Sequence, residues 1–338
     1  MKVISLFSGC GGLDLGFKNA GFKIVFANDN DKDVLETYKQ NHHMDIDKRS
    51  IVDIKSSEIP DADGIIGGPP CQSWSLAGAM RGANDERGKL FYEYIRILKD
   101  KKPYFFVAEN VPGIISKTHL PEFNKIVEQF CKIGYLISCE PVDARDFGVS
   151  QERKRVIIVG YQKSLKKEFE FPKKQEWKTL RDAIGDLPSA MPAREKNYSN
   201  KNLEVPNHEY MNGGFSTIYM SRNRKRSWDE QSFTIQAGGR HAPLHPSSSN
   251  MHKIGEDKWD FEGDNPKYRR LSVRECARIQ TFPDDFIFYY DNVAKGYKMV
   301  GNAVPVKLAK AIASQIKTDF SGQKLSITGK KILPAIIE

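Results

Sequence analysis

The first 160 residues alternate short apolar runs with longer stretches whose apolar side chains recur every three or four positions. Short apolar runs are typical of buried strands, and the longer stretches are typical of helices that cover a sheet. Phe91, Tyr94 and Leu98 show the helical spacing, as do Phe123 and Val127. The predicted strands are VISLF (3–7), KIVFAN (23–28), GIIGG (64–68), YFFVAEN (104–110) and RVIIVG (155–160). The pattern predicts an α/β domain built on a parallel sheet.

From residue 161 the sequence becomes rich in Pro, Asn, Ser and Lys and loses this periodicity, which favours a second domain of irregular or short β structure. Residues 161–270 hold 20 Lys and Arg against 15 Asp and Glu, a net +5 of the chain's +9. That charge favours a polyanionic partner such as nucleic acid. The predicted organisation is a first domain over 1–163, a small domain over 164–285, a return to the first domain with a final helix over 286–320, and a tail over 321–338.

Several protein classes are disfavoured by the sequence. No apolar run approaches the roughly 18 residues that a membrane helix needs, and the N-terminus lacks the pattern of a signal peptide. The five cysteines are scattered, with no Cys-x-x-Cys and no His spacing suited to zinc. We therefore expect a cytosolic protein with free thiols and no metal site.

A glycine turn, FSGCGGLDLGF (7–17), follows the first predicted strand and opens a predicted helix. Glycines let the backbone approach a ligand closely, so the turn predicts a nucleotide-type site. Asp29, at the end of the next strand, is placed to accept the hydroxyls of a ribose, although it could equally be a helix cap. Because Gly9-x-Gly11-Gly12 is not the Gly-x-Gly-x-x-Gly that frames a pyrophosphate, we predict a cofactor without one, such as S-adenosylmethionine.

A thiol and a carboxylate follow two other predicted strands. Cys71 comes after GIIGG and two prolines that fix the loop, and Glu109 ends the strand FFVAE. The carboxyl edge of a parallel sheet brings both to one place. Taken alone, Cys71 is as well interpreted as a buried small hydrophobe. Arg153 and Arg155 of QERKR could activate its thiolate, or be solvated charges at a strand start.

Methylation of cytosine at C5 needs this combination of a thiol, a carboxyl group and a methyl donor. Addition of a thiolate to C6 makes C5 nucleophilic, and a carboxyl group at N3 offsets the charge that develops. Methylation of C5, loss of its proton and expulsion of the thiol complete the reaction. Because the ring must be reached from both faces, the base has to leave a duplex stack.

These residues lie in motifs that resemble those of the DNA (cytosine-5) methyltransferase family over about 1–318. The motifs occur in the family's order: FSGCGGLDLGF, DI (53–54), GGPPCQSWS (67–75), RGKLFYEYIRIL (87–98), AENV (108–111), QERKRV (151–156), RRLSVRECARIQTFPDDF (269–286) and YKMVGNAVP (297–305). The resemblance is greatest to bacterial restriction-modification enzymes that read GGCC or related GG/CC sites. It implies a mixed, mainly parallel seven-stranded Rossmann-like sheet, a small target-recognition domain, and DNA in the cleft between them.

The resemblance also implies residue roles. Cys71 would be the nucleophile, Glu109 would act at N3, Arg155 would contact the flipped cytosine, and Gln151 and Arg153 would order their loop. The residues implied around S-adenosylmethionine are Phe7, Ser8, Gly9, Cys10, Gly11, Gly12, Leu13, Asp29, Asn30, Asp53, Ile54, Pro69, Leu90, Asn302 and Ala303. Asp29 stands where the family more often has Glu, and Val52 replaces a usual Gly.

The segment 221–243 carries the residues expected to meet DNA. An arginine side chain can donate two hydrogen bonds to guanine, at O6 and N7. We therefore assign Arg224, Arg226 and Arg240 to bases and Lys225 to a phosphate. The full set of expected DNA contacts is Gln72, Ser73, Arg222, Arg224, Lys225, Arg226, Arg240 and His241. The alternative is a solvated basic loop that only holds phosphates. Enzymes that read GGCC carry a polar Gln-Cys-Gln segment at the place of residues 241–243 of this chain. The DNA sequence that this protein recognises could therefore differ from GGCC.

The predicted function is therefore a site-specific DNA cytosine-5 methyltransferase that acts as a monomer on duplex DNA, beside a separate endonuclease for the same site. Alternatives are a tRNA cytosine-5 methyltransferase, which the developed recognition segment disfavours, and an inactive DNA-binding relative, which intact Cys71, Glu109 and Arg155 disfavour. An NAD-dependent dehydrogenase is more distant, because the glycine spacing is wrong for it.

Overall fold

The computed structural model describes residues 1–70, 86–200 and 202–321. Its central sheet has the strand order β2-β1-β3-β4-β6-β5. The strands are β1 (Lys2–Leu6), β2 (Lys23–Asn28), β3 (Gly64–Gly67), β4 (Phe105–Asn110), β5 (Tyr135–Asp143) and β6 (Lys154–Gln162). Strands β1 to β4 pair in parallel, whereas β6 runs antiparallel to both of its neighbours, β4 and β5. The α/β fold with a mainly parallel sheet is confirmed, with six strands in the described residues against the seven expected.

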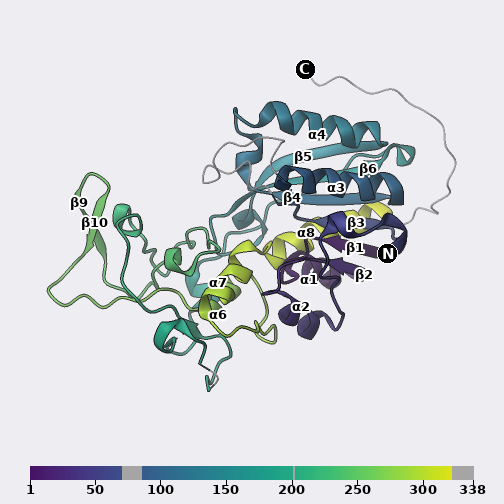
Figure 1. The fold of residues 1–338 in the computed structure, drawn as a ribbon. Helices are drawn as coiled ribbons and strands as arrows, with labels where there is room; N and C mark the ends of the chain where they lie inside the picture. The colour runs from purple at the N-terminus through teal and green to yellow at the C-terminus, as the bar shows by residue number, and fades with distance from the viewer. Residues whose placement is uncertain (71–85, 201, 322–338) are drawn as a thin grey trace.

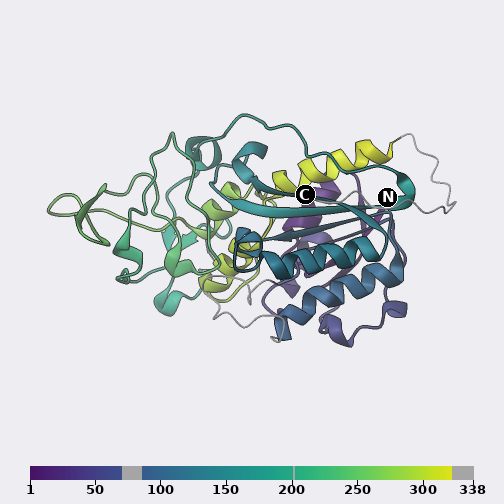
Figure 2. The same ribbon diagram turned by 90° about the horizontal axis from the view of Figure 1, so that it is seen from above.

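Helices cover both faces of this sheet (Figures 1 and 2). The larger part of the molecule contains α1 (Gly12–Asn19), α2 (Leu35–His42), α3 (Glu86–Lys101), α4 (Leu120–Lys132), α7 (Val293–Asn302) and α8 (Val306–Phe320). Figure 2 shows α8, in yellow, on one side of the sheet, and α3 and α4, in blue, on the other. The final helix α8 lies beside the first helix α1, and Gly16 of α1 leaves room for Ala309.

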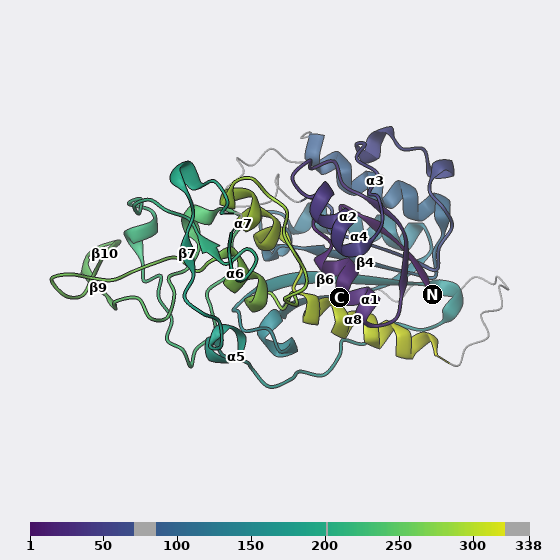
Figure 3. The ribbon, with the colours of Figure 1, turned by 90° about the horizontal axis from the view of Figure 1, so that it is seen from below.

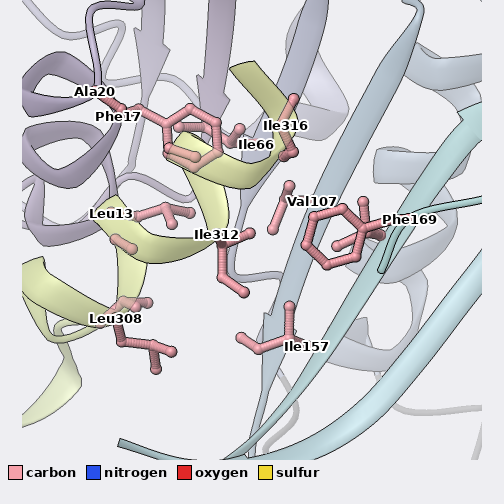
Figure 4. Close-up of a cluster of buried hydrophobic side chains, with 14 of the residues drawn as sticks. Leu13, Phe17, Ala20, Ile66, Val107, Ile157, Phe169, Leu308, Ile312 and Ile316 are labelled. Atoms are coloured by element: carbon pink, nitrogen blue, oxygen red, sulfur yellow. The ribbon is translucent and has the colours of Figure 1, made fainter. Parts of the chain in front are cut away.

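The strands supply alternate residues to two separate cores, as the period of two requires. Ile66, Val107 and Ile157 pack with α1 and α8 on one face (Figure 4). Their neighbours Ile65, Phe106 and Ile158 pack with α3 and α4 on the other face. Burial of both faces explains why β3, β4 and β6 are apolar almost throughout.

The segment between β6 and α7 forms the smaller part of the molecule. It contains α5 (Leu180–Ile184), β7 (Met191–Pro192), β8 (Glu209–Tyr210), β9 (Met251–Gly255), β10 (Lys258–Phe261) and α6 (Val273–Ile279). The antiparallel β9–β10 hairpin lies at the end farthest from the sheet (Figures 1 and 3). Short strands and 3-10 turns dominate, in keeping with the irregular β structure that the sequence predicts.

The two parts share a hydrophobic cluster. Cys10 and Val34 of the first domain pack in one cluster with Cys276 of α6 and Met299 of α7. The predicted boundary at 285 thus falls between two helices of a common core. No helix of the described chain is both long and apolar enough to cross a bilayer.

Candidate active site

A cavity of about 550 Å³ opens at the carboxyl ends of β1 to β4. Its walls come from the glycine turn after β1, the loop after β2, the loop after β3, the end of β4 and the helix α7. The predicted cofactor residues on its wall are Phe7, Ser8, Gly9, Cys10, Gly12, Leu13, Asp29, Asn30, Pro69, Leu90, Asn302 and Ala303. The volume suits a small-molecule ligand.

The glycine turn has a backbone that side chains would disrupt. Gly9 and Gly11 have φ of 56° and 88°, in the left-handed region that favours glycine. A Cβ on Gly11 would lie 2.1 Å from Nε2 of His42, and a Cβ on Gly12 would lie 2.6 Å from the Val304 carbonyl oxygen. The turn is therefore held between α2 on one side and the α7–α8 connection on the other.

Asp29 fastens the next loop to this turn. Its carboxylate accepts hydrogen bonds from the amide N–H groups of Gly9, at 2.8 Å, and Asp31, at 2.9 Å. Burial raises the pKa of Asp29, and these two amide donors oppose the rise. Asp29 also lines the cavity.

Three predicted cofactor residues are not on the cavity wall. Gly11 lies behind it against His42, Asp53 is exposed, and Ile54 is buried in the sheet core. Ser50 and Ile51 line the cavity in their place.

Sequence reasoning also missed several wall residues. Asp14 is fully buried in α1, where its carboxylate accepts hydrogen bonds from the hydroxyls of Ser5, at 2.6 Å, and Tyr38, at 2.5 Å. Burial raises the pKa of Asp14 to about 6, against the opposing effect of these hydroxyl donors. The sequence signal that could have identified Asp14 is a carboxylate on the apolar face of the predicted helix. The other missed wall residues include Asn28, Asp31, Val34, Lys298 and Met299.

Glu109 and Arg155 form an ion pair; the resemblance implies that both act on the target base, but the pair itself was not predicted. Nε of Arg155 lies 2.8 Å from Oε1 of Glu109, and each side chain is 12% exposed. The antiparallel pairing of β4 with β6 brings them together, since Glu109 is opposite Ile157. Burial lowers the pKa of the Arg155 guanidinium, and the Glu109 carboxylate opposes this. Glu109 also lines the cavity.

The loop after β3 passes directly beside this pair. A Cβ on Gly68 would lie 3.5 Å from Oε2 of Glu109, and the Asn110 side-chain amide donates to the Pro69 carbonyl at 3.1 Å. The described part of this loop ends at Pro70. Cys71, Gln72 and Ser73 lie outside the described residues, so their predicted roles stay predictions.

Gln151 and Arg153 join the two parts of the molecule. The Arg153 guanidinium is fully buried and donates to the carbonyl oxygens of Ile235, Gly301 and Ala303. The Gln151 side chain accepts from the Ile235 amide and donates to Gln280. These hydrogen bonds fix both side chains in place; the loop-ordering role of the two residues and a direct catalytic contact of Arg153 stay predictions.

The predicted DNA-reading arginines differ in their availability. Arg224 is buried, stacks on Tyr219 and donates to the carbonyl oxygens of Tyr219 and Ile218. Arg226 pairs with two glutamates, Glu230 at 3.0 Å and Glu152 at 3.3 Å.

The remaining predicted DNA contacts are more open. Lys225 donates to the side chain of Asn250 at 2.6 Å. Arg222 and Arg240 are exposed, and His241 is half-buried. The structure therefore leaves Arg222, Arg240 and His241 more open to DNA than Arg224 and Arg226.

The sequence profile of the C-5 cytosine-specific DNA methylase family matches residues 1–318. The chain belongs to that family. It is 64% identical over 325 residues to the type II methyltransferase M.MthTI of Methanothermobacter thermautotrophicus, covering 95% of this chain and 98% of that protein. It is 54% identical over 331 residues to M.FnuDI of Fusobacterium nucleatum, covering 96% of each.

Solved structures agree on the fold. The Entamoeba histolytica methyltransferase EhMeth superposes with a TM-score of 0.69 at 16% identity, over 95% of this chain and 99% of that one. Family membership and these relatives confirm the predicted resemblance and support a DNA cytosine-5 methyltransferase of the restriction-modification type. The dehydrogenase alternative is wrong. Among the described residues no group of three His, Cys, Asp or Glu is suited to a metal ion.

Proposed function

We propose that this methyltransferase modifies C5 of a flipped cytosine within a short duplex site of the GGCC or related GG/CC type. Cys71 is the proposed nucleophile, which adds to C6 of that base. The observation that carries the proposal is the ion pair between Glu109 and Arg155, at 2.8 Å, beside the loop that leads to Cys71.

The cavity fits S-adenosylmethionine as the proposed cofactor. Its glycine turn permits close approach of a ligand, and Asp29 presents carboxylate oxygens for hydroxyl groups. The wall carries Asp29 and Asp31 against Lys298, which itself lies 2.7 Å from Asp31. This balance of charge suits a cationic ligand. When bound, S-adenosylmethionine supplies an electrophilic methyl group on its sulfonium.

The protein's own groups have separate tasks in the proposed reaction. The Cys71 thiolate makes the ring nucleophilic by adding to C6, and Glu109 stabilises the charge that develops at N3. Arg155 holds the Glu109 carboxylate in place and contacts the base. Pro69 and Pro70 restrict the backbone directly before the nucleophile, which preorganises its approach.

Methylation mapping tests this proposal. The protein is incubated with S-adenosylmethionine and unmethylated genomic DNA, and 5-methylcytosine is located by bisulfite sequencing. We expect one short site to be methylated. Absence of methylation on any DNA, under conditions where S-adenosylmethionine binds, would contradict the proposal, and methylation of tRNA alone would favour the RNA alternative.

Two variants test the assigned residues. Cys71→Ala should abolish turnover and retain DNA binding, because the covalent step alone is lost. Glu109→Gln should lower kcat by a factor of about 100 or more, because a group that acts on the developing charge is typically worth that much. Cys131→Ala, on α4, is the matched control and should methylate normally. A normal rate for Cys71→Ala would exclude the covalent mechanism.

A further inference from the structure

A second cavity, of about 510 Å³, has Arg155 in its wall. Lys154 and Arg155 line it from the start of β6, and Arg222 and His241 line it from the recognition segment. Glu109 lines the first cavity and Arg155 the second, so their ion pair separates the two spaces. If the target cytosine is held at this pair, as proposed above, the second cavity receives its neighbours in the DNA.

Some side chains at this cavity already have hydrogen-bond partners in the protein. Arg224 is committed to the backbone carbonyls of Ile218 and Tyr219. Asn223 uses its side-chain oxygen to accept the Lys225 amide at 2.9 Å. The imidazole of His241 makes no hydrogen bond within the described chain, and it lines the cavity.

The backbone fixes where this imidazole lies. His241 ends the 3-10 turn Gly239–His241, and its amide donates to the Gly238 carbonyl at 2.8 Å. Gly239 is packed so closely that a Cβ there would lie 2.6 Å from the Tyr297 ring. On the other side, Ala242 is buried and its carbonyl accepts the Tyr219 hydroxyl at 2.9 Å. A side chain presented from such a packed turn is preorganised for recognition.

Burial and neighbouring charges favour the neutral protonation state of the His241 imidazole. Burial lowers the pKa of His241, and Arg224, Arg222, Arg240 and Arg270 lower it further. The cavity wall adds the positive charges of Lys154 and Arg155 and the negative charge of Glu152. A neutral imidazole has one donor and one acceptor nitrogen, whereas arginine and lysine can only donate. His241 can therefore accept from an amino group that the surrounding cations would repel.

We propose that His241 is a specificity-determining residue that hydrogen-bonds, as a donor and acceptor, to the base pair next to the target cytosine. Arginines at the same cavity contact the phosphates or guanines around it. The inference rests on the proposed function, because it takes the target cytosine to lie at Glu109 and Arg155.

Site maps of single variants test this role. Bisulfite maps of genomic DNA are compared for the parent protein, His241→Ala, His241→Gln and the control His252→Gln, which changes an exposed histidine on β9. For His241→Ala we expect discrimination at one position beside the target cytosine to fall about 10- to 100-fold, since one good base contact is worth about 1–3 kcal/mol. Other positions should keep their preference. His241→Gln, which still donates and accepts, should retain most of the discrimination.

The pattern of loss separates this role from a structural one. Equal weakening at every position, or an unchanged map for His241→Ala, would overturn the inference. The melting temperature of His241→Ala and its KM for S-adenosylmethionine should match those of the parent protein. A variant that changes only in these two quantities would also overturn the inference. If the parent protein methylates no DNA, the proposed function fails; if it methylates and the His241→Ala map is unchanged, only this inference fails.

Discussion

At the residue scale, the cofactor turn depends on a histidine that no motif marks. His42 of α2 stacks on Tyr38, with ring centroids 4.3 Å apart, and packs against Gly11. Both of its ring nitrogens are buried without a hydrogen-bond partner among the described residues. A charged imidazole there would be costly, because the desolvation outweighs the opposing effect of the Cys10 and Gly11 backbone.

The pH dependence of stability follows from this burial. Burial lowers the pKa of His42 to about 3, whereas an unfolded histidine titrates near 6.5. The unfolded chain therefore takes up a proton first, so stability from this group is complete above about pH 6.5 and falls as pH is lowered. The expected loss at pH 5 is about 2 kcal/mol.

The variant His42→Leu isolates this effect, since leucine cannot titrate. We expect the slope of unfolding free energy against pH, between 5 and 6.5, to be smaller in the variant by about one proton. Urea unfolding at several pH values measures it, with His252→Leu on exposed β9 as the control. Equal slopes in His42→Leu and the parent would show that His42 binds protons equally in the folded and unfolded chains, so that burial does not lower its pKa.

The sequence predicted the chemistry of single residues better than their surroundings. Glu109 could be placed at the active-site edge in advance, because it lies at the end of an apolar strand, but its ion pair with Arg155 depends on β6 running antiparallel to β4, which the apolar pattern does not indicate. The hydrogen bonds of Arg224 to the carbonyl oxygens of Ile218 and Tyr219 could not be predicted either. The arginines at alternate positions in 222–226 look equivalent in the sequence until the turns that accept these hydrogen bonds are known.

At the scale of elements, strands that are continuous apolar runs were predictable and one interrupted by polar residues and proline was not. The predicted run 23–28 coincides with β2, and 104–110 overlaps β4. Strand β5 was missed because most of it is only half-buried and it carries Glu140 and Pro141, which disrupt any apolar alternation.

The contact between α1 and α8 gives a prediction at this scale. A Cβ on Gly16 would lie 2.3 Å from the Ala309 Cβ and 2.7 Å from the Lys310 amide nitrogen. Alanine has the higher helix propensity, by about 1 kcal/mol, but overpacking costs about 1–3 kcal/mol. Because backbone atoms are among those contacted, we expect overpacking to dominate.

Gly16→Ala should therefore lower the free energy of unfolding by about 1–2 kcal/mol, measured by urea denaturation. The double variant Gly16→Ala with Ala309→Gly removes one of the two methyl groups and should recover part of the loss. The single change Ala309→Gly serves as the reference for that comparison. A stabilised Gly16→Ala protein would mean that α8 shifts to accommodate the methyl group.

At the scale of the whole molecule, two cavities are built where distant segments meet. The first combines the N-terminal turns with α7, and the second combines the start of β6 with 222–243. The sequence predicts many wall residues but not which segments meet at each cavity, because the packing of Cys10 and Val34 against α6 and α7 aligns the two parts. The net charge of +9 then acts on any polyanion that enters between them.

This charge predicts how salt affects DNA binding. Each phosphate neutralised by a cation changes the slope of log K against log salt by about 0.9, because condensed counterions are released. Lys154 and Arg222 are exposed and line the second cavity. Replacing either with Gln should reduce the magnitude of the slope by about 0.9 and weaken binding to all sequences alike. Lys23→Gln, at the opposite edge of the sheet where β2 begins, should leave the slope unchanged, as should His241→Ala. Titrations by fluorescence anisotropy at several salt concentrations measure these slopes, and an unaltered slope in Lys154→Gln and Arg222→Gln would place the DNA backbone elsewhere.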